Sequence, residues 1–335
     1  MCSIRGAVTE ELKRDYREDL TLFEGARSRG LAWLFVAAVI AYALFVAQGF
    51  ALYVLTTLAL MVVAALGLNL LVGYTGQISL GHAAFLAIGA YTHVILYTQG
   101  APFFVTAVAG ALTAGVFGFL IGIPALRLKG PYLAIATLGF QVAVDQILGR
   151  WDSVTGGRMG LGVPAMDVFG AKLGEHAKFL VCFGVCVLSV VGIYNLSRSR
   201  VGRAFVAIRD NETAAEAMGV GLVKYKTMAF ALSACVTGLA GALYAHLFDR
   251  INPSNFTLVM SIELLVMVVV GGLASVLGSV LGASLLVLLP QLISSFRDFQ
   301  AVIVGGILIA VLLFEPLGMR GRWLRIKYYF KAWPF

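Results

Sequence analysis

The sequence predicts an all-α polytopic membrane protein of about ten transmembrane helices, some broken or short, with both ends of the chain cytoplasmic. Of its 335 residues 60% are hydrophobic and only 13% are charged, and the mean hydropathy is +0.92. Soluble domains have about 25% charged residues, whereas apolar runs of bilayer-spanning length recur along most of this chain. No polar interval is long enough for a sizeable soluble domain, which argues against catalysis by a soluble head.

Ten apolar segments are the expected spans. Two of them, 131–149 and 258–270, are short for a full crossing and could be broken or tilted. The polar ends define a cytoplasmic tail at 1–30 and a basic cytoplasmic tail at 319–335, around a transmembrane domain at 31–318. The expected spans lie near residues 31–49, 51–73, 76–99, 103–127, 131–149, 177–197, 227–248, 258–270, 276–293 and 299–315.

The distribution of positive charge sets the expected orientation. The net charge is +8, and in a membrane protein such charge is interpreted by its location before it suggests nucleic acid. With the N-terminus inside, 19 of the 25 lysines and arginines fall in the tails and cytoplasmic loops. This asymmetry supports an even number of spans. It places the loop 198–226 in the cytoplasm and the loop 150–176 outside.

The segment 67–91, GLNLLVGYTGQISLGHAAFLAIGAY, interleaves glycine and polar residues with apolar ones. Its polar side chains would be costly facing lipid, and its glycines permit close packing or a break in the helix. A break at membrane depth is tolerated where protein shields it or where it lines a water-filled cavity. The segment is therefore either part of a translocation path or a polar seam between helices. The candidate path residues are Asn69, Gln77, Ser79 and His82, and the candidate packing or breaking glycines are Gly73, Gly76 and Gly81.

For His82 alone, an interior histidine with satisfied hydrogen bonds is the competing interpretation.

The loop 150–176 is rich in glycine and turn formers. It is either a plain connector or a lid or docking surface for an external partner.

The loop 198–226 is the long polar interval of the apolar second half. Within it, Arg209 to Gly219 is predicted to form a short capped helix, with Asp210 or Asn211 as N-cap and Gly219 ending the helix. Such a helix could dock into a groove on another protein, or the segment could be an ordinary loop. Spacing gives the helix two faces, one with Ala214, Ala217 and Met218 and the other with Glu212 and Glu216.

The segment 271–283, GGLASVLGSVLGA, carries a third cluster of glycines. Two of them form a GxxxG-like pair, which first of all indicates helix packing. The candidate packing or breaking glycines here are Gly271, Gly272, Gly278 and Gly282.

Few groups in the spans carry ionisable chemistry. Asp145 lies near the outer end of its expected span and Glu263 a few residues into another, and each is either an interfacial group that reaches water or a path-lining residue. Ion-coupled pumps usually need chains of such residues inside the membrane. Cys182 and Cys186 lie one helical turn apart without a second metal-binding pair, so packing is expected rather than a metal site. The sequence has no Walker A motif, zinc motif or nucleophile elbow. Any transport is therefore expected to be powered from elsewhere.

Several ordered motifs together resemble the LivM-type permease of branched-chain amino acid ABC importers. The resemblance runs from about residue 50 to 318. Ala274 departs from it by occupying a glycine position, and Leu277 stands where proline is common. Arg158 and Met159 replace small or polar residues. The matching motifs are the 67–91 segment, GPYLAIATLGF (130–140), TGG (155–157) followed by Gly160-Leu161, GRAFVAIRDNETAAEAMGV (202–220), TGLAGALYA (237–245) and LFEPLG (313–318).

The resemblance implies a non-enzymatic permease subunit in a bacterial inner membrane, surrounded by lipid and working by alternating access. Its implied partners are a LivH-like permease, two cytoplasmic ATP-binding subunits and a periplasmic substrate-binding protein, with ATP bound by the partners. No cofactor, metal or nucleic acid is expected for this chain. The segment 209–219 then looks like the coupling helix that contacts an ATPase. The implied coupling residues are Arg209, Asp210, Glu212, Glu216 and Gly219.

Two alternatives remain open. Urea and short-amide importers have closely similar permeases, so the same architecture could carry those substrates. A stand-alone channel or secondary transporter is the alternative from a different class, and transport without an ATPase would distinguish it.

Overall fold

A computed structural model describes residues 26–126, 128, 130–168, 171–292, 305, 306 and 309. The chain divides into two compact units, Met1–Val46 and Ala47–Phe335. The described part of the first unit is one helix, α2 (Ala26–Phe45). Most of the expected tail 1–30, most of the expected span 299–315 and the whole expected tail 319–335 lie outside the described residues.

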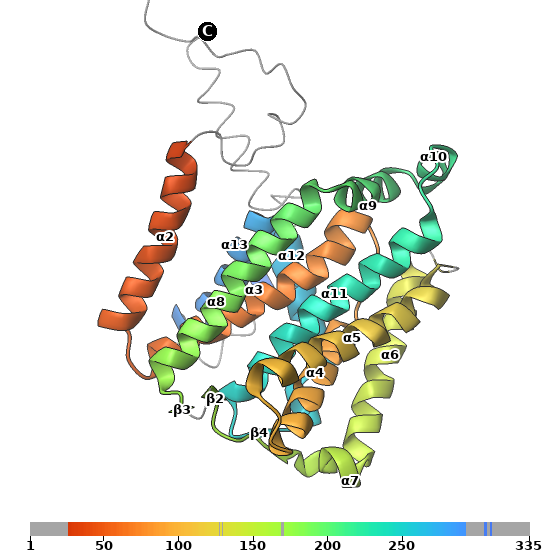
Figure 1. Cartoon of the computed structure of the whole chain (residues 1–335). Helices are drawn as coiled ribbons and strands as arrows, with labels where there is room; N and C mark the ends of the chain where they lie inside the picture. The colour runs from red at the N-terminus through yellow and green to blue at the C-terminus, as the bar shows by residue number, and fades with distance from the viewer. Residues whose placement is uncertain are drawn as a thin grey trace, which may run out of the picture. The chain divides into compact units, whose positions relative to one another are not determined.

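The second unit is a bundle of helices, which confirms the all-α membrane fold (Figure 1). Six described helices are long and apolar enough to cross a membrane by length and composition: α3, α5, α6, α8, α11 with the short η2, and α12 with the preceding η3. The total of ten spans stays a prediction. The helices are α3 (Phe50–Thr75), α4 (His82–Thr98), α5 (Phe103–Ala125), α6 (Pro131–Arg150), α8 (Glu175–Arg198), α9 (Arg200–Asp210), α10 (Glu212–Ala217), α11 (Leu222–Tyr244), η2 (Ala245–Leu247), η3 (Pro253–Asn255), α12 (Leu258–Gly271) and α13 (Val276–Leu292).

Two boundaries differ from the predicted ones for physical reasons. The span predicted at 76–99 begins only at His82, because residues 76–81 leave the helix altogether. The span predicted at 227–248 begins earlier, at Leu222. The first turn of α11 carries Lys224 and Lys226, so the helix is polar where it starts, and hydropathy cannot detect such a turn.

The described residues of the segment 150–176 form short helices and strands. The segment contains α7 (Asp152–Thr155), η1 (Gly157–Met159), β1 (Leu161–Gly162), β2 (Asp167–Val168) and β3 (Ala171–Lys172). β2 pairs with β3, and β1 pairs antiparallel with β4 (Arg250–Ile251), with Leu161 opposite Ile251. A side chain at Gly160, where φ is +72°, would strike the Ile251 carbonyl. The TGG-x-x-GL pattern therefore fastens this segment to the chain that follows α11.

Helix α11 packs against α3, α4 and α5, and in Figure 1 it runs between α3 and α5. Backbones approach closely there: a Cβ added at Gly89 would strike the backbone of Gly238, and one at Gly241 would strike the Leu86 carbonyl. Small residues at helix crossings allow this approach and the van der Waals contact that stabilises membrane helices. The TGLAGALYA stretch is thus a packing motif at the centre of the bundle.

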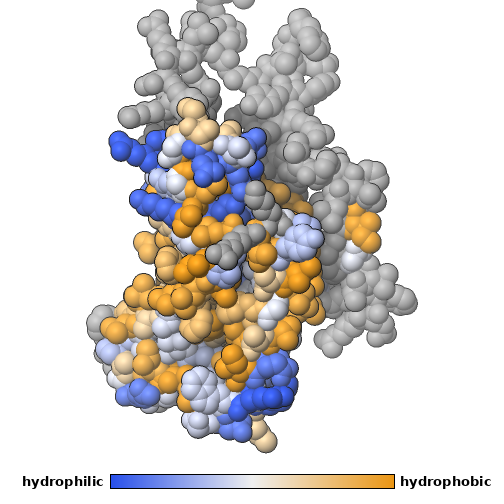
Figure 2. All heavy atoms as spheres, turned by 90° about the vertical axis from the view of Figure 1, so that its right-hand side faces the viewer, coloured by the Kyte–Doolittle hydropathy of each residue, from blue (hydrophilic) through white to orange (hydrophobic). Residues whose placement is uncertain are grey.

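Hydrophobic side chains form a belt on the face drawn in Figure 2, between hydrophilic groups near α9 and α10 and others at the opposite end. Helix α5 contributes a row of exposed apolar side chains to the surface of the bundle. Apolar surface of this extent requires lipid or another membrane protein around it. The exposed residues on α5 include Val105, Val108, Leu112, Val116, Leu120 and Ile123.

Candidate functional site

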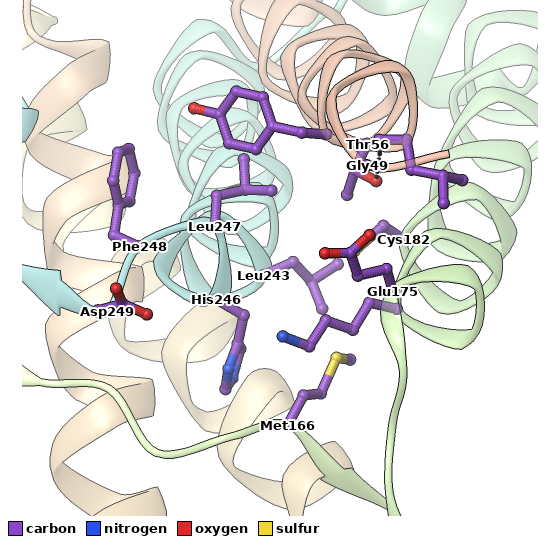
Figure 3. Close-up of a pocket in the computed structure, with 13 residues that line it drawn as sticks. Gly49, Thr56, Met166, Glu175, Cys182, Leu243, His246, Leu247, Phe248 and Asp249 are labelled. Carbon is purple, nitrogen blue, oxygen red and sulfur yellow. Dashed lines mark hydrogen bonds between the residues drawn. The ribbon is translucent and has the colours of Figure 1, made fainter. Parts of the chain in front are cut away.

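Two groups of polar side chains in the second unit lie at opposite ends of α3. At its N-terminal end a cavity of about 180 Å³ opens between α3, α8 and the end of α11 (Figure 3). At its C-terminal half a network of hydrogen bonds joins α3 to α9 and to the turn between α12 and α13. The second group contains most of the residues singled out from the sequence.

Asn69 fastens α3 to the α12–α13 turn. Its side chain is 1% exposed, and its amide nitrogen donates to the Ser275 carbonyl at 2.9 Å and to the Ser279 hydroxyl at 2.8 Å. Its amide oxygen accepts from the backbone N–H of Ala274 at 3.0 Å. Asn69 thus has partners for both ends of its amide, as a polar group in a seam between helices requires.

Ala274 adopts a left-handed backbone conformation, with φ of +55°, and no other non-glycine residue described has positive φ. This explains why a glycine belongs at this position in the resemblance, because a Cβ is crowded by the backbone there. A Cβ added to Gly73 would strike the Asn69 amide oxygen and the Ala274 backbone nitrogen. Gly73 is therefore a close-packing glycine, which is one of the two roles considered from the sequence.

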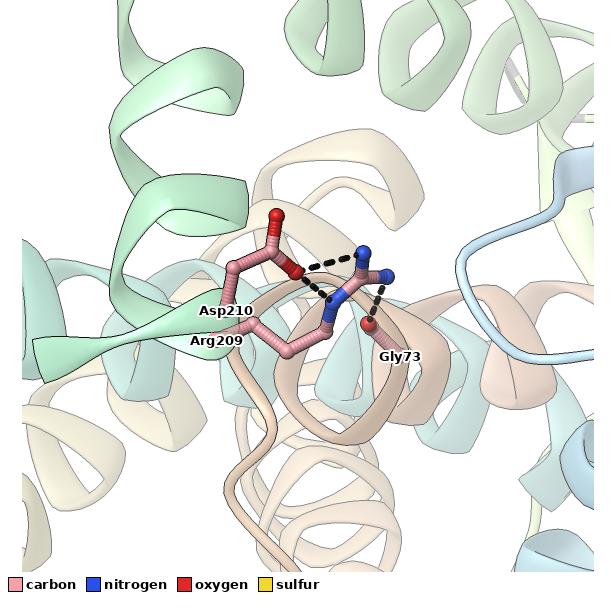
Figure 4. Close-up of polar contacts among 3 residues, drawn as sticks. All are labelled: Gly73, Arg209 and Asp210. Carbon is pink, nitrogen blue, oxygen red and sulfur yellow. Dashed lines mark hydrogen bonds and ion pairs between the residues drawn. The ribbon is translucent and has the colours of Figure 1, made fainter.

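Arg209 extends the network to α9. Its Nη1 donates to the Gly73 carbonyl at 3.2 Å, while its Nε and Nη2 donate to one carboxylate oxygen of Asp210 at 3.1 and 2.9 Å (Figure 4). Gly73 lies in the last turn of α3, where carbonyls lack helical partners and the helix dipole favours a cation. Of the candidate coupling residues, Arg209 therefore contacts the end of α3, and Asp210 binds Arg209 beside it.

The chain breaks between α3 and α4 inside the protein. Gly76, at φ +70°, ends α3, and the N–H groups of Gly76 and Gln77 return to the carbonyls of Val72 and Leu71 at 3.1 and 3.2 Å. This is the left-handed glycine cap that closes many helices. At Gly81 an added Cβ would strike the Thr137 carbonyl, so this residue is a close contact with α6.

His82 is fully buried at the start of α4 and is hydrogen-bonded at both nitrogens. Nδ1 lies 3.0 Å from the Ser79 hydroxyl and Nε2 lies 2.8 Å from the Ser233 hydroxyl, which donates to the Gly67 carbonyl at 2.6 Å. Because the Ser233 proton is used there, Nε2 donates to Ser233. His82 therefore joins α4, α11 and α3 through hydrogen bonds at both ring nitrogens.

Gln77 differs from the other three candidate path residues. Its side chain is 5% exposed, and neither its amide oxygen nor its amide nitrogen has a hydrogen-bond partner among the described residues. Buried amides nearly always have partners. Of the four residues, Gln77 therefore has hydrogen-bonding capacity left for water or a passing solute. The path role of all four stays a prediction.

Sequence reasoning missed several polar contacts of the bundle. The Thr137 hydroxyl accepts from the N–H of Leu80 at 2.9 Å, and the Ser261 hydroxyl accepts from the N–H of Ala83 at 2.9 Å, so α6 and α12 hold the break in place. His93 and His246 share a 2.7 Å contact between their Nε2 atoms. Single hydroxyls and lone histidines in apolar segments carry no distinctive pattern, which is why these contacts escaped notice.

The glycines of 271–283 bring α12 and α13 together. A Cβ at Gly271 would strike the Gly278 carbonyl, and one at Gly282 would strike the Met267 carbonyl. Gly272 has φ of +118° at the turn between the two helices. The GxxxG-like pair thus packs one helix of this hairpin on the other.

The predicted helix 209–219 has different boundaries in the structure. Arg209 and Asp210 end α9, and only Glu212–Ala217 form α10. Asn211 is the N-cap, because its side-chain oxygen accepts from the N–H of Ala214 at 3.0 Å, whereas the Asp210 carboxylate binds Arg209 instead. Gly219 has φ of +83° and no atom near an added Cβ, so it is required for the turn and not for packing.

The faces of α10 also differ from the predicted ones. Glu212 forms an ion pair of 2.7 Å with Lys226, whose side chain is 4% exposed, and Ala215 is the buried residue of the helix. Glu212 therefore anchors α10 to α11, while Glu216 is exposed. Ala214, Ala217 and Met218, expected on one apolar side, are all exposed, Met218 to 85%.

These features define a multi-pass membrane protein with a short exposed helix at one end of its bundle. The chain belongs to the family described as branched-chain amino acid transport system / permease component, which matches residues 50–312. It is therefore a multi-pass protein of the bacterial inner membrane, with the permease component as its family.

Similar proteins include permease components with two kinds of named transport system. The chain is 33% identical over 274 residues to the high-affinity branched-chain amino acid transport system permease protein LivM of Escherichia coli (strain K12), covering 74% of this chain and 64% of that protein. It is 29% identical over 235 residues to the autoinducer 2 import system permease protein LsrC of Escherichia coli (strain K12 / DH10B), covering 66% of each chain. No solved structure matches this chain.

Proposed function

We propose that the chain is a permease subunit of an ABC importer that moves branched-chain amino acids inward. The observation that carries this proposal is the family match over 263 residues, 50–312, together with a relative named for this transport. In this proposal the chain pairs with a LivH-like permease. Two ATP-binding subunits supply ATP hydrolysis, and a periplasmic binding protein delivers the substrate.

The contacts of α9 and α10 support a coupling role. α10 exposes Glu216 and Met218 to a partner while the Glu212–Lys226 pair ties it to α11. Displacement of α10 would move α9, and Arg209 would transmit the movement to the Gly73 carbonyl of α3. Closure of the nucleotide-bound ATPases could thus reach the spans without any charged relay inside the membrane.

ATP-dependent uptake of labelled leucine, isoleucine and valine in vesicles that carry the complete complex tests the proposal. The intact chain is compared with Glu216→Lys, which reverses an exposed charge, and with Gly219→Arg, which places a side chain at positive φ. Both variants are expected to lose uptake while the complex still assembles. Lys224→Gln, in the first turn of α11, serves as the control and should retain uptake.

Other outcomes distinguish the alternatives. Uptake of urea, a short amide or autoinducer 2 in place of leucine would support the importer function and overturn the proposed substrate. Uptake that continues without the ATP-binding subunits would overturn the importer and support a stand-alone channel or secondary transporter.

A further inference from the structure

The cavity at the N-terminal end of α3 has the composition of a small-molecule site. It lies at the end of the bundle opposite α9 and α10, because α3 and α8 begin there and α11 ends there. In the expected orientation this is the outer side. Its volume of about 180 Å³ exceeds that of a 150 Å³ cavity known to hold benzene. A molecule of the size of a small amino acid can therefore enter.

Both signs of charge line the cavity. Glu175 and Lys178 come from the first turn of α8, three residues apart and thus on one side of that helix, and Asp249 comes from the segment after α11. Figure 3 shows the two carboxylates on these different elements, with His246 also at the cavity. No side-chain hydrogen bond or ion pair joins Glu175, Lys178 or Asp249 to any residue that the structure describes. One cation and two anions are thus left to bind a ligand.

Apolar side chains form another part of the wall. Leu52 and Leu243 are 2% and 1% exposed, and Leu247 and Phe248 extend the same surface. The Nε2 of His246 is already occupied by His93, so this histidine completes the wall and is not counted among the free polar groups. Small-molecule sites typically combine a mainly apolar lining with a few polar groups that orient the ligand.

We propose that this cavity binds the free zwitterion of an amino acid with a small aliphatic side chain. Lys178 would receive the carboxylate, Glu175 and Asp249 would receive the ammonium group, and the leucine-lined wall would receive the side chain. The inference rests on the proposed function, because it gives the transported amino acid a place to bind in this chain after a binding protein releases it.

Equilibrium binding of labelled leucine to the complete permease–ATPase complex in nanodiscs, without binding protein, tests the site. Lys178→Gln is expected to weaken binding about tenfold or more, since a hydrogen bond to a charged group is lost. The double variant Glu175→Gln/Asp249→Asn should weaken it similarly. Arg150→Gln removes a cation from the exposed end of α6, away from the cavity, and should bind leucine as the intact chain does.

Ligand analogues give a readout that misfolding cannot mimic. In the intact complex, 4-methylpentanoate lacks the ammonium group and 3-methylbutylamine lacks the carboxylate, so each should compete with leucine at least about tenfold more weakly than leucine itself. Competition by either analogue as strong as that of leucine would overturn the proposal. So would unchanged leucine affinity in both cavity variants, or no leucine binding by the intact complex.

Parallel uptake assays separate this inference from the proposed function. The intact complex could take up leucine with ATP and yet not bind leucine at this cavity. That result would support the importer function and overturn the proposed site. Absence of leucine uptake, with uptake of another solute, would instead overturn the amino acid substrate.

Discussion

At the scale of single residues, the most informative position is Asn69. It was selected from the sequence because an amide facing lipid is costly. The structure gives it three partners, two on the α12–α13 turn and one, Ser279, in α13 itself. A buried amide whose donors and acceptor all have partners stabilises one particular packing of helices. If one partner is removed, the groups that it bound stay buried without a hydrogen bond, which costs free energy.

Asn69→Ala should therefore destabilise the protein by about 1–3 kcal/mol, because the hydrogen bonds from the Asn69 amide to Ser275, Ser279 and Ala274 are lost. The thermal denaturation midpoint of the purified complex in detergent measures the effect. The matched control is Asn195→Ala on the exposed side of α8, which should leave the midpoint nearly unchanged. Equal midpoints for Asn69→Ala and the intact chain would show that these bonds contribute nothing.

Ala274→Gly should instead increase the stability of the protein. The left-handed conformation at φ +55° costs an L-residue about 1–2 kcal/mol, and glycine removes that cost while losing some chain entropy on folding. A net gain of up to about 1 kcal/mol is expected in the same assay. Ala143→Gly, in the exposed interior of α6, should lose about 1 kcal/mol. A loss at both positions would contradict the strain at Ala274.

At the scale of elements, hydropathy located most helices because apolar runs of bilayer length leave few alternatives. It could not find α9, whose residues 200–210 are mixed in polarity, nor the polar first turn of α11. It also could not say which of two adjacent polar residues caps α10. That choice depends on Arg209, which holds the Asp210 carboxylate and leaves the cap to Asn211.

Helix crossings at α11 should tolerate no extra methyl group. Gly241→Ala would push a Cβ into the Leu86 carbonyl and is expected to cost about 1–3 kcal/mol through overpacking. Gly184→Ala on α8 meets no atom within 4 Å and should gain up to about 1 kcal/mol in helix propensity. Denaturation midpoints of the two variants, measured side by side, should shift in opposite directions; a shared direction would contradict the close crossing.

At the scale of the whole molecule, the family and the all-α fold followed from the sequence because the motifs extend over most of the chain. The polar contacts among distant helices did not follow. Ser233, Ser261 and Thr137 bind groups on distant segments, and nothing in their local sequence specifies which ones. The amide of Gln77, for which the described residues provide no hydrogen-bond partner, likewise depends on the packing of the whole bundle.

The orientation of the bundle makes a testable prediction. Met159 and Met218 are 80% and 85% exposed at opposite ends of the molecule, in the segment 150–176 and beside α10. In a chain without its four native cysteines, Met159→Cys should react with a membrane-impermeant maleimide added to spheroplasts. Met218→Cys should react only after permeabilisation. The reverse pattern would invert the topology, and labelling of both from outside would show that α8 does not cross the membrane.

The ion pair between Glu212 and Lys226 has a mechanical consequence. Lys226 is almost completely shielded from water, so separating α10 from α11 would strand an ammonium ion, a change that costs about 3–5 kcal/mol when a buried pair loses one member. A partner that pushes on α10 therefore cannot separate it from α11 without this cost in free energy. The partner must displace α10 and the start of α11 together, as one rigid unit. The hydrogen bond from Arg209 to Gly73 carries the same displacement to α3. Movement of the short helix then moves the two spans α11 and α3 with it, because α10 does not swing independently of them.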